Sequence, residues 1–236
     1  LRLDSAITSI RVERVTPRVP YKETVTAKRE SDYVHKKQTG GHGQYARVAI
    51  AIEPLPRGSG FEFVNKIVGG SVPKQYIPAV EKGVHEALIE GVIAHYPLVD
   101  LRVTLFDGKE HPVDSSEMAF KLAGAQALKK GSQEAGPILL EPVMSLHITV
   151  PEEHTGDVLS DLNGKRGKVL GMNPQGDGLT LIEAQAPLSE VQRYATDLRS
   201  MTQGRAYYTM EISHYEEVPA HVAQRVIDEA QKAASS

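Results

Sequence analysis

The sequence contains no cysteine, no long apolar run and no excess of positive charge. Without cysteine the chain has no disulfide framework and no thiolate metal or redox centre, which fits a reducing cytosol. No stretch reaches the roughly 18 apolar residues that a membrane-spanning helix needs, and no signal peptide opens the chain. The formal net charge of -3 excludes a generic polyanion binder. Any contact with nucleic acid must therefore come from a local patch.

One segment of the chain is basic, although the chain as a whole carries a negative net charge. Between Arg11 and Arg47 there are nine basic residues and four acidic ones. Inside it lies a glycine-rich bend at residues 35–45, where three of the four residues 40–43 are glycine. Because glycine has no Cβ, the backbone there can take positive φ and approach a partner closely. The bend indicates either a tight hairpin turn or a nest of N–H groups that binds phosphate, and its spacing leaves both readings open.

Catalytic and metal-binding motifs are weak. No glycine-rich loop ends in Gly-Lys-Ser/Thr, which excludes a Walker nucleotide site. His111, Asp114 and Ser115 permit a hydrolase reading, but triads usually assemble from separate segments and no nucleophile elbow is present. We expect Asp114 and Ser115 to cap the next helix and His111 to be exposed on its loop. His35 and His42 flank the bend without a third ligand, so we expect no metal site.

Apolar periodicity predicts the elements of the first half. A turn at Asp107 and Gly108 is expected to end the last of its strands. Asp114 with Glu117 resembles a capping box for a following helix, and Gly131 is expected to end that helix. Strands are predicted at residues 6–15, 21–28, 48–52, 61–64 and 99–105, and a helix at 78–90.

The second half follows a different order. Residues 137–142 read as a short, stiff connector between two domains, because prolines stand at both of its ends. After it we predict strands at 143–150, 168–172, 179–186 and 208–212, with helices at 152–163 and 191–198. Gly176-Asp177-Gly178 is a hairpin signal between the middle strands. The order βαββαβ indicates a ferredoxin-like domain. An amphipathic helix is predicted after Pro219.

Six ungapped segments resemble translation elongation factor G, and the resemblance extends from about Tyr21 to Pro219. They are residues 36–41 (KKQTGG), 60–70 (GFEFVNKIVGG), 76–83 (YIPAVEKG), 113–121 (VDSSEMAFK), 139–142 (LLEP) and 194–200 (YATDLRS).

This resemblance implies an α+β chain and its domain boundaries. Residues 1–18 would end the third domain of that family, 19–138 would form the fourth, 139–219 the fifth, and 220–236 a C-terminal helix packed back on the fourth. The fourth domain would be like ribosomal protein S5 domain 2, with an unusual left-handed βαβ crossover, and the fifth would be ferredoxin-like. Since the chain begins at Leu1 within a strand pattern, we expect it to be part of a longer protein.

The family also implies a function. Its fourth domain enters the decoding centre of the small ribosomal subunit during GTP-dependent translocation, and its fifth lies near the factor-binding region of the large subunit. We therefore expect a cytoplasmic monomer that binds the ribosome, tRNA and mRNA and contacts no membrane. We expect neither catalytic residues nor cofactors in this segment, with GTP and magnesium in a preceding G domain. The alternatives are a ribosome recycling or ribosome-protection factor and, much less favoured, a small hydrolase using His111 and Ser115.

Two tip loops of the fourth domain contact the tRNA–mRNA duplex in this family. A glutamine amide and an imidazole can reach 2′-hydroxyls and base edges in a shallow minor groove, while basic side chains neutralise phosphates. The candidate contacts carried over are Gln38, Thr39, Gly40, Gly41, His42, Gly43, Gln44, Lys109 and His111. The candidate phosphate contacts are Arg29, Lys36 and Lys37.

Two positions depart from the usual family pattern. His42 stands where most members have Arg, and Ala46 where Gly is usual. The Gly-Gly-His-Gly form and residues 221–225 are similar to the second-type, elongation factor G-like paralogues. A neutral histidine would bind phosphate less well than the forked, always charged guanidinium of arginine.

Overall fold

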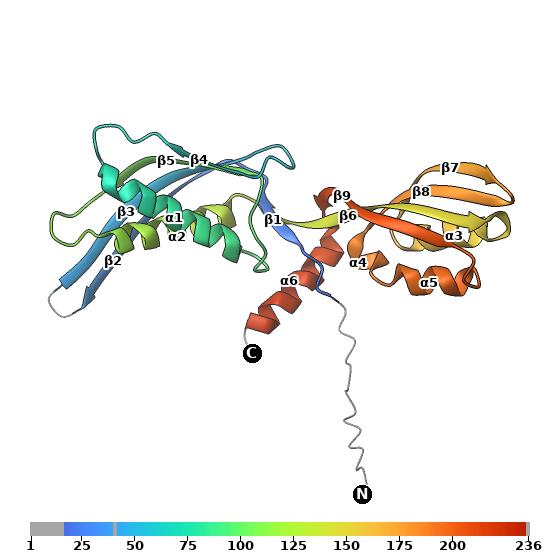
Figure 1. The fold of residues 1–236 in the computed structure, drawn as a ribbon. Coiled ribbons are helices and arrows are strands. Elements are labelled where there is room, and N and C mark those ends of the chain that lie inside the picture. Colours follow the sequence, from blue (N-terminus) through green and yellow to red (C-terminus); the bar gives the residue numbers. More distant parts are fainter. Residues whose placement is uncertain (1–16, 40–41, 235–236) are drawn as a thin grey trace, which may run out of the picture.

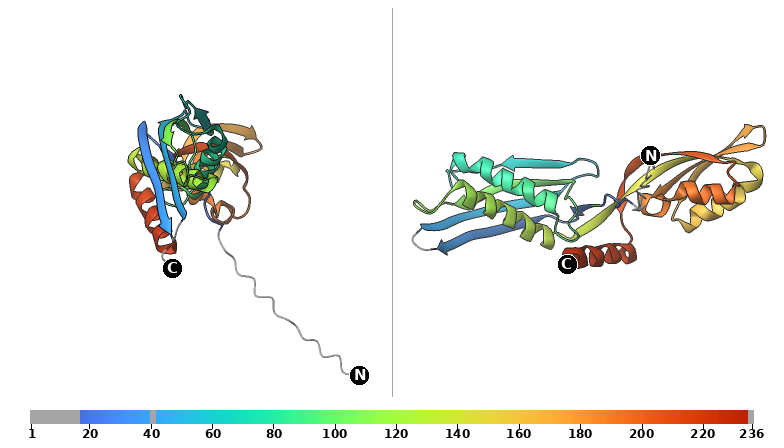
Figure 2. Two further views of the ribbon diagram at one scale, coloured as in Figure 1. Left: turned by 90° about the vertical axis from the view of Figure 1, so that its left-hand side faces the viewer. Right: turned by 60° about the horizontal axis from the view of Figure 1, so that its bottom comes forward.

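Two β-sheets, each covered by helices on one face, lie end to end in this computed structural model (Figures 1 and 2). The structure describes residues 17–39 and 42–234. The strand predicted at residues 6–15 lies outside the described residues.

The first sheet has the strand order β2-β3-β5-β4. Its strands are β2 (Arg29–Thr39), β3 (His42–Pro54), β4 (Phe61–Asn65) and β5 (Leu101–Lys109). β3 pairs antiparallel with β2 and with β5, whereas β4 pairs parallel with β5. Val48, Ile50 and Ile52 are fully buried on one face of β3, which confirms the face predicted from their alternation.

Two helices cover the inner face of this sheet, α1 (Ile77–Glu90) and α2 (Glu117–Glu134) (Figure 1). Each follows a strand that ends at the same edge of the sheet, so both helices begin at that edge. The prediction that Gly131 ends α2 is wrong, because α2 continues to Glu134. A Cβ at Gly131 would lie 2.6 Å from Cδ1 of Ile52. This glycine permits close packing of helix on sheet and does not stop the helix.

The second sheet has β6 (Pro137–Pro151) at its centre, with β8 (Leu179–Pro187) and then β7 (Lys168–Gly176) on one side and β9 (Tyr207–Glu217) on the other. Its helices are α3 (Thr155–Gly164), α4 (Leu188–Val191) and α5 (Tyr194–Met201), with a 3₁₀ turn at Glu152–His154 before α3. In the first domain a 3₁₀ turn at Lys74–Tyr76 precedes α1. The order of elements in the second domain is that of a ferredoxin-like fold, as predicted. The predicted hairpin is confirmed by positive φ at Asp177 and Gly178.

Residues 137–142, predicted to be a short, stiff connector, begin the 15-residue strand β6. They pair antiparallel with β1 (Lys22–Val25), from Lys22–Leu140 to Val25–Pro137. β1 itself lies within residues 19–138, the range predicted for the domain before this strand. Pro137 is tolerated because it is the first residue of the strand, and Pro142 because it lies beside a β-bulge.

The final predicted helix is α6 (Ala220–Ala234), which lies beside the junction of the two domains (Figure 2). Val222 and Val226 on its inner face pack in one cluster with Tyr21, Ala94 and Leu139. This cluster combines side chains from the residue just before β1, from the loop after α1 and from β6. The helix therefore packs against both domains at once.

Candidate nucleic-acid interface

Two loops lie together at the free end of the first domain. The β2–β3 pairing continues to Thr39 and His42, so the glycine-rich bend is the tip of a long hairpin. The loop at residues 110–116 follows β5 and reaches the same end (Figure 1). The term "tip" is used below for residues 36–39, 42–45 and 109–116. The structure thus brings together two segments about 70 residues apart in sequence.

The predicted turn at Asp107 and Gly108 is wrong, since both residues belong to β5. β5 continues to Lys109, which pairs with Arg47, and a register shift opposite Ala49 and Ile50 absorbs one residue of β5. A Cβ at Gly108 would lie 2.6 Å from the Arg47 carbonyl oxygen. The glycine thus permits a close strand–strand approach, and the second loop begins three residues later than predicted.

Asp114 joins this loop to the hairpin. Its Oδ1 accepts a hydrogen bond from the Gly43 backbone N–H at 3.2 Å, and its carbonyl oxygen accepts one from the Tyr45 N–H at 2.8 Å. A Cβ at Gly43 would lie 2.7 Å from Cγ of Asp114. Gly43 is not among the residues with positive φ. Its lack of a side chain therefore serves the close approach of the loop, whereas the sequence had pointed to positive φ.

Ser115 makes a second connection between the loops. Its hydroxyl donates to the Tyr45 carbonyl oxygen at 2.7 Å and accepts from the His111 N–H at 2.8 Å. The prediction that Asp114 and Ser115 cap the next helix is therefore wrong. Ser116 is the N-cap of α2, and its hydroxyl accepts from Ala119 N–H at 3.1 Å.

His111 lies on the surface of the tip with its side chain 48% exposed. The backbone N–H groups of Val113 and Asp114 donate to its Nδ1 at 3.3 and 3.2 Å. A nitrogen that accepts must carry a lone pair, so the neutral ring carries its proton on Nε2. Its ring centroid lies 6.1 Å from that of Tyr45, which borders the same surface.

The other predicted contacts divide into three groups. Lys36, Lys37, Gln38 and Lys109 are exposed at the tip. Gln44 is half-buried and its side chain hydrogen bonds with His35 at 2.9 Å. For Thr39 and His42 the structure gives the backbone pairing, and Gly40 and Gly41 lie outside the described residues.

Arg29 is not part of the tip. It begins β2, at the far end of the hairpin from residues 39–42. Its Nε donates to the Glu134 carbonyl oxygen at 2.9 Å, next to the C-terminus of α2. A guanidinium there satisfies a helix carbonyl that has no intrahelical partner.

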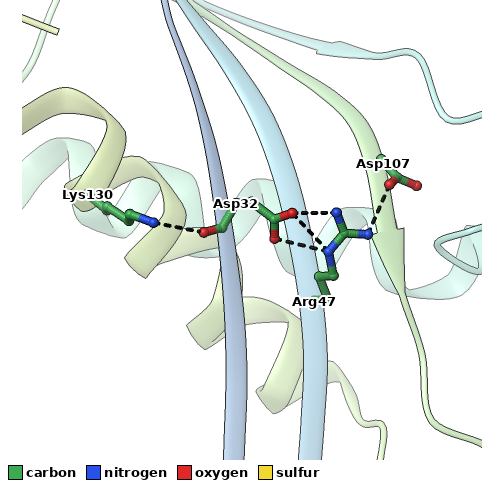
Figure 3. Close-up of polar contacts among 4 residues, drawn as sticks. All are labelled: Asp32, Arg47, Asp107 and Lys130. Atoms are coloured by element: carbon green, nitrogen blue, oxygen red, sulfur yellow. Dashed lines mark hydrogen bonds and ion pairs between the residues drawn. The ribbon is translucent and has the colours of Figure 1, made fainter. Parts of the chain in front are cut away.

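Arg47 links three strands just behind the tip (Figure 3). Its Nε donates to Asp32 on β2 at 2.9 Å and its Nη1 to Asp107 on β5 at 3.0 Å. The Gly108 N–H and the Arg47 guanidinium hold the pKa of Asp107 below its usual value. Lys130 of α2 donates to the Asp32 carbonyl oxygen at 3.3 Å. The charge of Arg47 is thus balanced by carboxylates.

The lysines of the tip differ from Arg47 in this respect. Within the described ranges, Lys36, Lys37 and Lys109 form no ion pair with a carboxylate. Their side chains are exposed and can meet phosphate oxygens at little cost in desolvation.

Sequence reasoning missed Tyr76, which supports the second loop from below. Its hydroxyl donates to the Ser115 carbonyl oxygen at 3.4 Å, and its ring stacks on Phe120 with centroids 4.7 Å apart. It belongs to a segment that carried the family resemblance, but no periodicity showed that it would meet this loop.

Among the described side chains, no group of three or more His, Asp and Glu residues could hold a metal ion. None of the described helices has the length and apolar content to cross a membrane.

Comparison with known proteins identifies the family. The family model for elongation factor G, domain IV, matches residues 17–150, and the one for the elongation factor G C-terminus matches residues 138–226. The chain belongs to the elongation factor G family. Its two sheets correspond to domains IV and V of elongation factor G, and the tip lies at the free end of domain IV.

Relatives and a solved structure agree with this assignment. An elongation factor G-like protein of Thermotoga maritima is 47% identical over 226 residues, covering 96% of the chain and 33% of the relative. Elongation factor G of Aquifex pyrophilus is 51% identical over 220 residues, covering 93% and 31%. A crystal structure of a Thermus thermophilus protein matches with a TM-score of 0.83 at 43% identity, covering 93% and 33%.

The chain therefore spans about a third of the length of these elongation factor G relatives. The two curated relatives carry different names at similar identity.

Proposed function

We propose that this chain is the ribosome-contacting part of a cytoplasmic translational GTPase. The tip of domain IV enters the decoding centre of the small subunit and holds the tRNA–mRNA duplex during GTP-dependent translocation. The observation that supports this most directly is the joining of the hairpin and the His111 loop at one end of the domain through Asp114 and Ser115. Gln38 and His111 are both exposed at this end of the domain.

The charge arrangement supports an RNA ligand. The lysines of the tip form no ion pairs among the described residues, while Arg47 behind them is neutralised by Asp32 and Asp107. Attraction to phosphate is therefore concentrated at the end of the domain. The amide of Gln38 and the imidazole of His111 can hydrogen bond to 2′-hydroxyls and base edges of a minor groove. Such contacts recognise the shape of the duplex and not its sequence.

In the proposed mechanism the tip acts as a wedge. It occupies the space beside the codon–anticodon duplex as the small subunit moves and prevents the duplex from slipping back. GTP and magnesium would bind in a G domain outside this chain, and domain V would lie near the factor-binding region of the large subunit. The chain itself would contribute positioning groups and no catalytic residue.

The hydrolase alternative has no support in the geometry. The Ser115 hydroxyl gives its hydrogen to the Tyr45 carbonyl oxygen, and its other contact is with the backbone of His111. A nucleophile would instead need a hydrogen bond to the imidazole. Recycling and ribosome protection use the same domains and are separated from translocation by assay.

A chimera can test the proposed function. The matching third of Aquifex pyrophilus elongation factor G is replaced by this chain, and single-round translocation is followed on stalled ribosomes. We expect Gln38→Ala and His111→Ala each to slow translocation about tenfold, equivalent to about 1.4 kcal/mol of lost transition-state stabilisation, with GTP hydrolysis unchanged.

Gln175→Ala and His221→Ala, at exposed positions remote from the tip, are the matched controls. An unchanged translocation rate and reading frame in both tip variants would contradict the assignment. Ribosomal subunit splitting is measured in parallel, in the presence of a recycling partner. If the tip variants impair splitting and leave translocation unchanged, the chain belongs to a recycling factor.

A further inference from the structure

We propose that Asp114 and Ser115 are positioning residues: they fix the His111 loop to the hairpin so that His111 offers a hydrogen-bond donor to RNA. This inference rests on the proposed function of the tip. It assigns a task to two side chains that the sequence predicts to be helix caps and that need not touch RNA themselves.

Asp114 holds the loop through two hydrogen-bond acceptors, its side-chain carboxylate and its backbone carbonyl oxygen. The carboxylate receives the Gly43 N–H and the backbone carbonyl receives the Tyr45 N–H. Both donors belong to the outer part of β3, where β5 no longer pairs with it. The loop thus replaces β5 as the hydrogen-bonding neighbour of β3, and Asp114 satisfies N–H groups that would otherwise face solvent.

The Ser115 hydroxyl has a role that few side chains can perform. It donates to the Tyr45 carbonyl oxygen and accepts from the His111 N–H at the same time. Only a group that both donates and accepts can bridge a carbonyl and an N–H. Threonine retains this ability and alanine loses it. Ser115 therefore fixes the backbone at His111, directly at the residue proposed to meet RNA.

The hydrogen bonds of the His111 imidazole determine whether its free ring nitrogen offers RNA a donor or an acceptor. Its Nδ1 accepts hydrogen bonds from the backbone N–H groups of Val113 and Asp114. The Asp114 carboxylate oxygen that lies 3.4 Å from Nδ1 is a neighbour and not a hydrogen-bond partner, because an accepting nitrogen has no hydrogen to donate. Among the described residues, Nε2 has no hydrogen-bond partner. The neutral ring carries its hydrogen on Nε2. The fitting ligand atom is therefore an acceptor, such as a 2′-hydroxyl oxygen or a base N3 or O2 in the minor groove.

Gly43 provides an independent test of the close approach. Its backbone does not require glycine for φ, but a Cβ there would lie 2.7 Å from Cγ of Asp114. Gly43→Ala should therefore push the His111 loop away from the hairpin. Asp114→Ala should release the same loop by removing its acceptor. Because both changes break the same contact, the double variant should be no worse than Asp114→Ala alone.

The first experiment measures the loop in the 236-residue chain by NMR. In the wild type we expect ring ¹⁵N shifts of His111 typical of the Nε2–H tautomer and slow exchange of the Tyr45 N–H. Ser115→Ala and Asp114→Ala should speed that exchange about tenfold and average the two tautomers. Ser115→Thr and Asp114→Asn, which keep the hydroxyl and an acceptor oxygen, should restore the wild-type pattern. Unchanged exchange and an unchanged tautomer in both alanine variants would overturn the proposal.

The second experiment uses the chimera described above, at several factor concentrations. Ser115→Ala should lower the maximal translocation rate about tenfold while the half-saturating concentration stays the same, as expected when the lost interaction acts in the transition state and not in binding. Ser115→Thr should recover the rate, and Ser160→Ala, exposed on α3, should have no effect.

The two proposals fail in different ways. If His111→Ala slows translocation and the Asp114 and Ser115 alanine variants do not, the positioning role is wrong and the tip function stands. If none of these variants has an effect, the tip function is wrong as well. If Ser115→Thr is as slow as Ser115→Ala, the bridging hydroxyl is not what matters, and the proposal is overturned.

Discussion

Glu23 shows how a single side chain can determine a fold locally. It lies on β1, is fully buried, and accepts backbone hydrogen bonds from Val92, Ile93, Ala94 and Tyr96 at 2.6 to 3.1 Å. No cation pairs with it among the described residues. Four N–H dipoles thus replace the water that burial removes. The loop after α1 wraps around this carboxylate and is held against β1.

Replacing Glu23 by alanine should be strongly destabilising. The four N–H groups would lose their acceptor in a buried site, and each unsatisfied group costs about 1 to 3 kcal/mol before water enters. We expect the free energy of unfolding to fall by about 3 kcal/mol or more, measured by urea denaturation of the 236-residue chain with circular dichroism. Glu30→Ala, an exposed neighbour on β2, is the control. Equal stability of the two variants would refute this account.

At the scale of elements, α1 and α2 approach each other through glycine. Gly83 faces the Lys121 carbonyl oxygen so closely that a Cβ would overlap it, and a Cβ at Gly124 would lie 2.8 Å from the Val80 carbonyl oxygen. The ion pair of Lys121 with Glu86 at 2.8 Å lies beside this contact. Backbone-to-backbone packing of this kind leaves no room for side chains. The close crossing keeps both helix N-termini beside the tip.

Two glycine-to-alanine changes should therefore have opposite effects. Gly83→Ala gains helix propensity but must separate the helices, and overpacking of this kind costs about 1 to 3 kcal/mol. Gly156→Ala, in α3 with nothing within 4 Å of its Cβ, should stabilise by about 0.5 kcal/mol because alanine restricts the unfolded chain. Thermal unfolding of both variants checks the signs. A stabilising Gly83→Ala would show that the helices can separate freely.

At the scale of the whole molecule, the two domains are joined by structure and not by a flexible linker. β1 pairs with the start of β6, and α6 covers this junction with Val222 and Val226 packed on Tyr21, Ala94 and Leu139. A continuous strand and a shared apolar cluster resist hinge motion better than a short loop would. The tip of domain IV is thus held at a defined distance from domain V, as the proposed wedge requires.

Releasing α6 should loosen this junction. Val222 is 6% exposed, and burial of a valine is worth roughly 1.5 kcal/mol or more. We expect Val222→Asp to increase trypsin cleavage after Arg225 at least about tenfold, because cleavage needs local unfolding of the helix. Val68→Asp, at a position 84% exposed, should leave the cleavage rate unchanged. Slow cleavage in both variants would mean that these side chains do not hold α6 in place.

Local sequence determined much of this molecule. Alternating valine and isoleucine in β3, the helical spacing of Val80, Val84 and Leu88, and the βαββαβ order of the second half are visible without coordinates. They are visible because burial repeats every two residues in a strand and about every 3.6 in a helix. Family resemblance added the two tip loops, which periodicity does not mark.

Tertiary structure alone decided which distant groups share hydrogen bonds. It paired β1 with β6, placed Arg29 at the far end of the hairpin, and made Asp114 and Ser115 the link between loops when their spacing indicated caps. The physical reason is that polar groups in loops have no period. An aspartate satisfies an N–H a few residues away or 71 residues away equally well, and only the folded chain determines which donor is near.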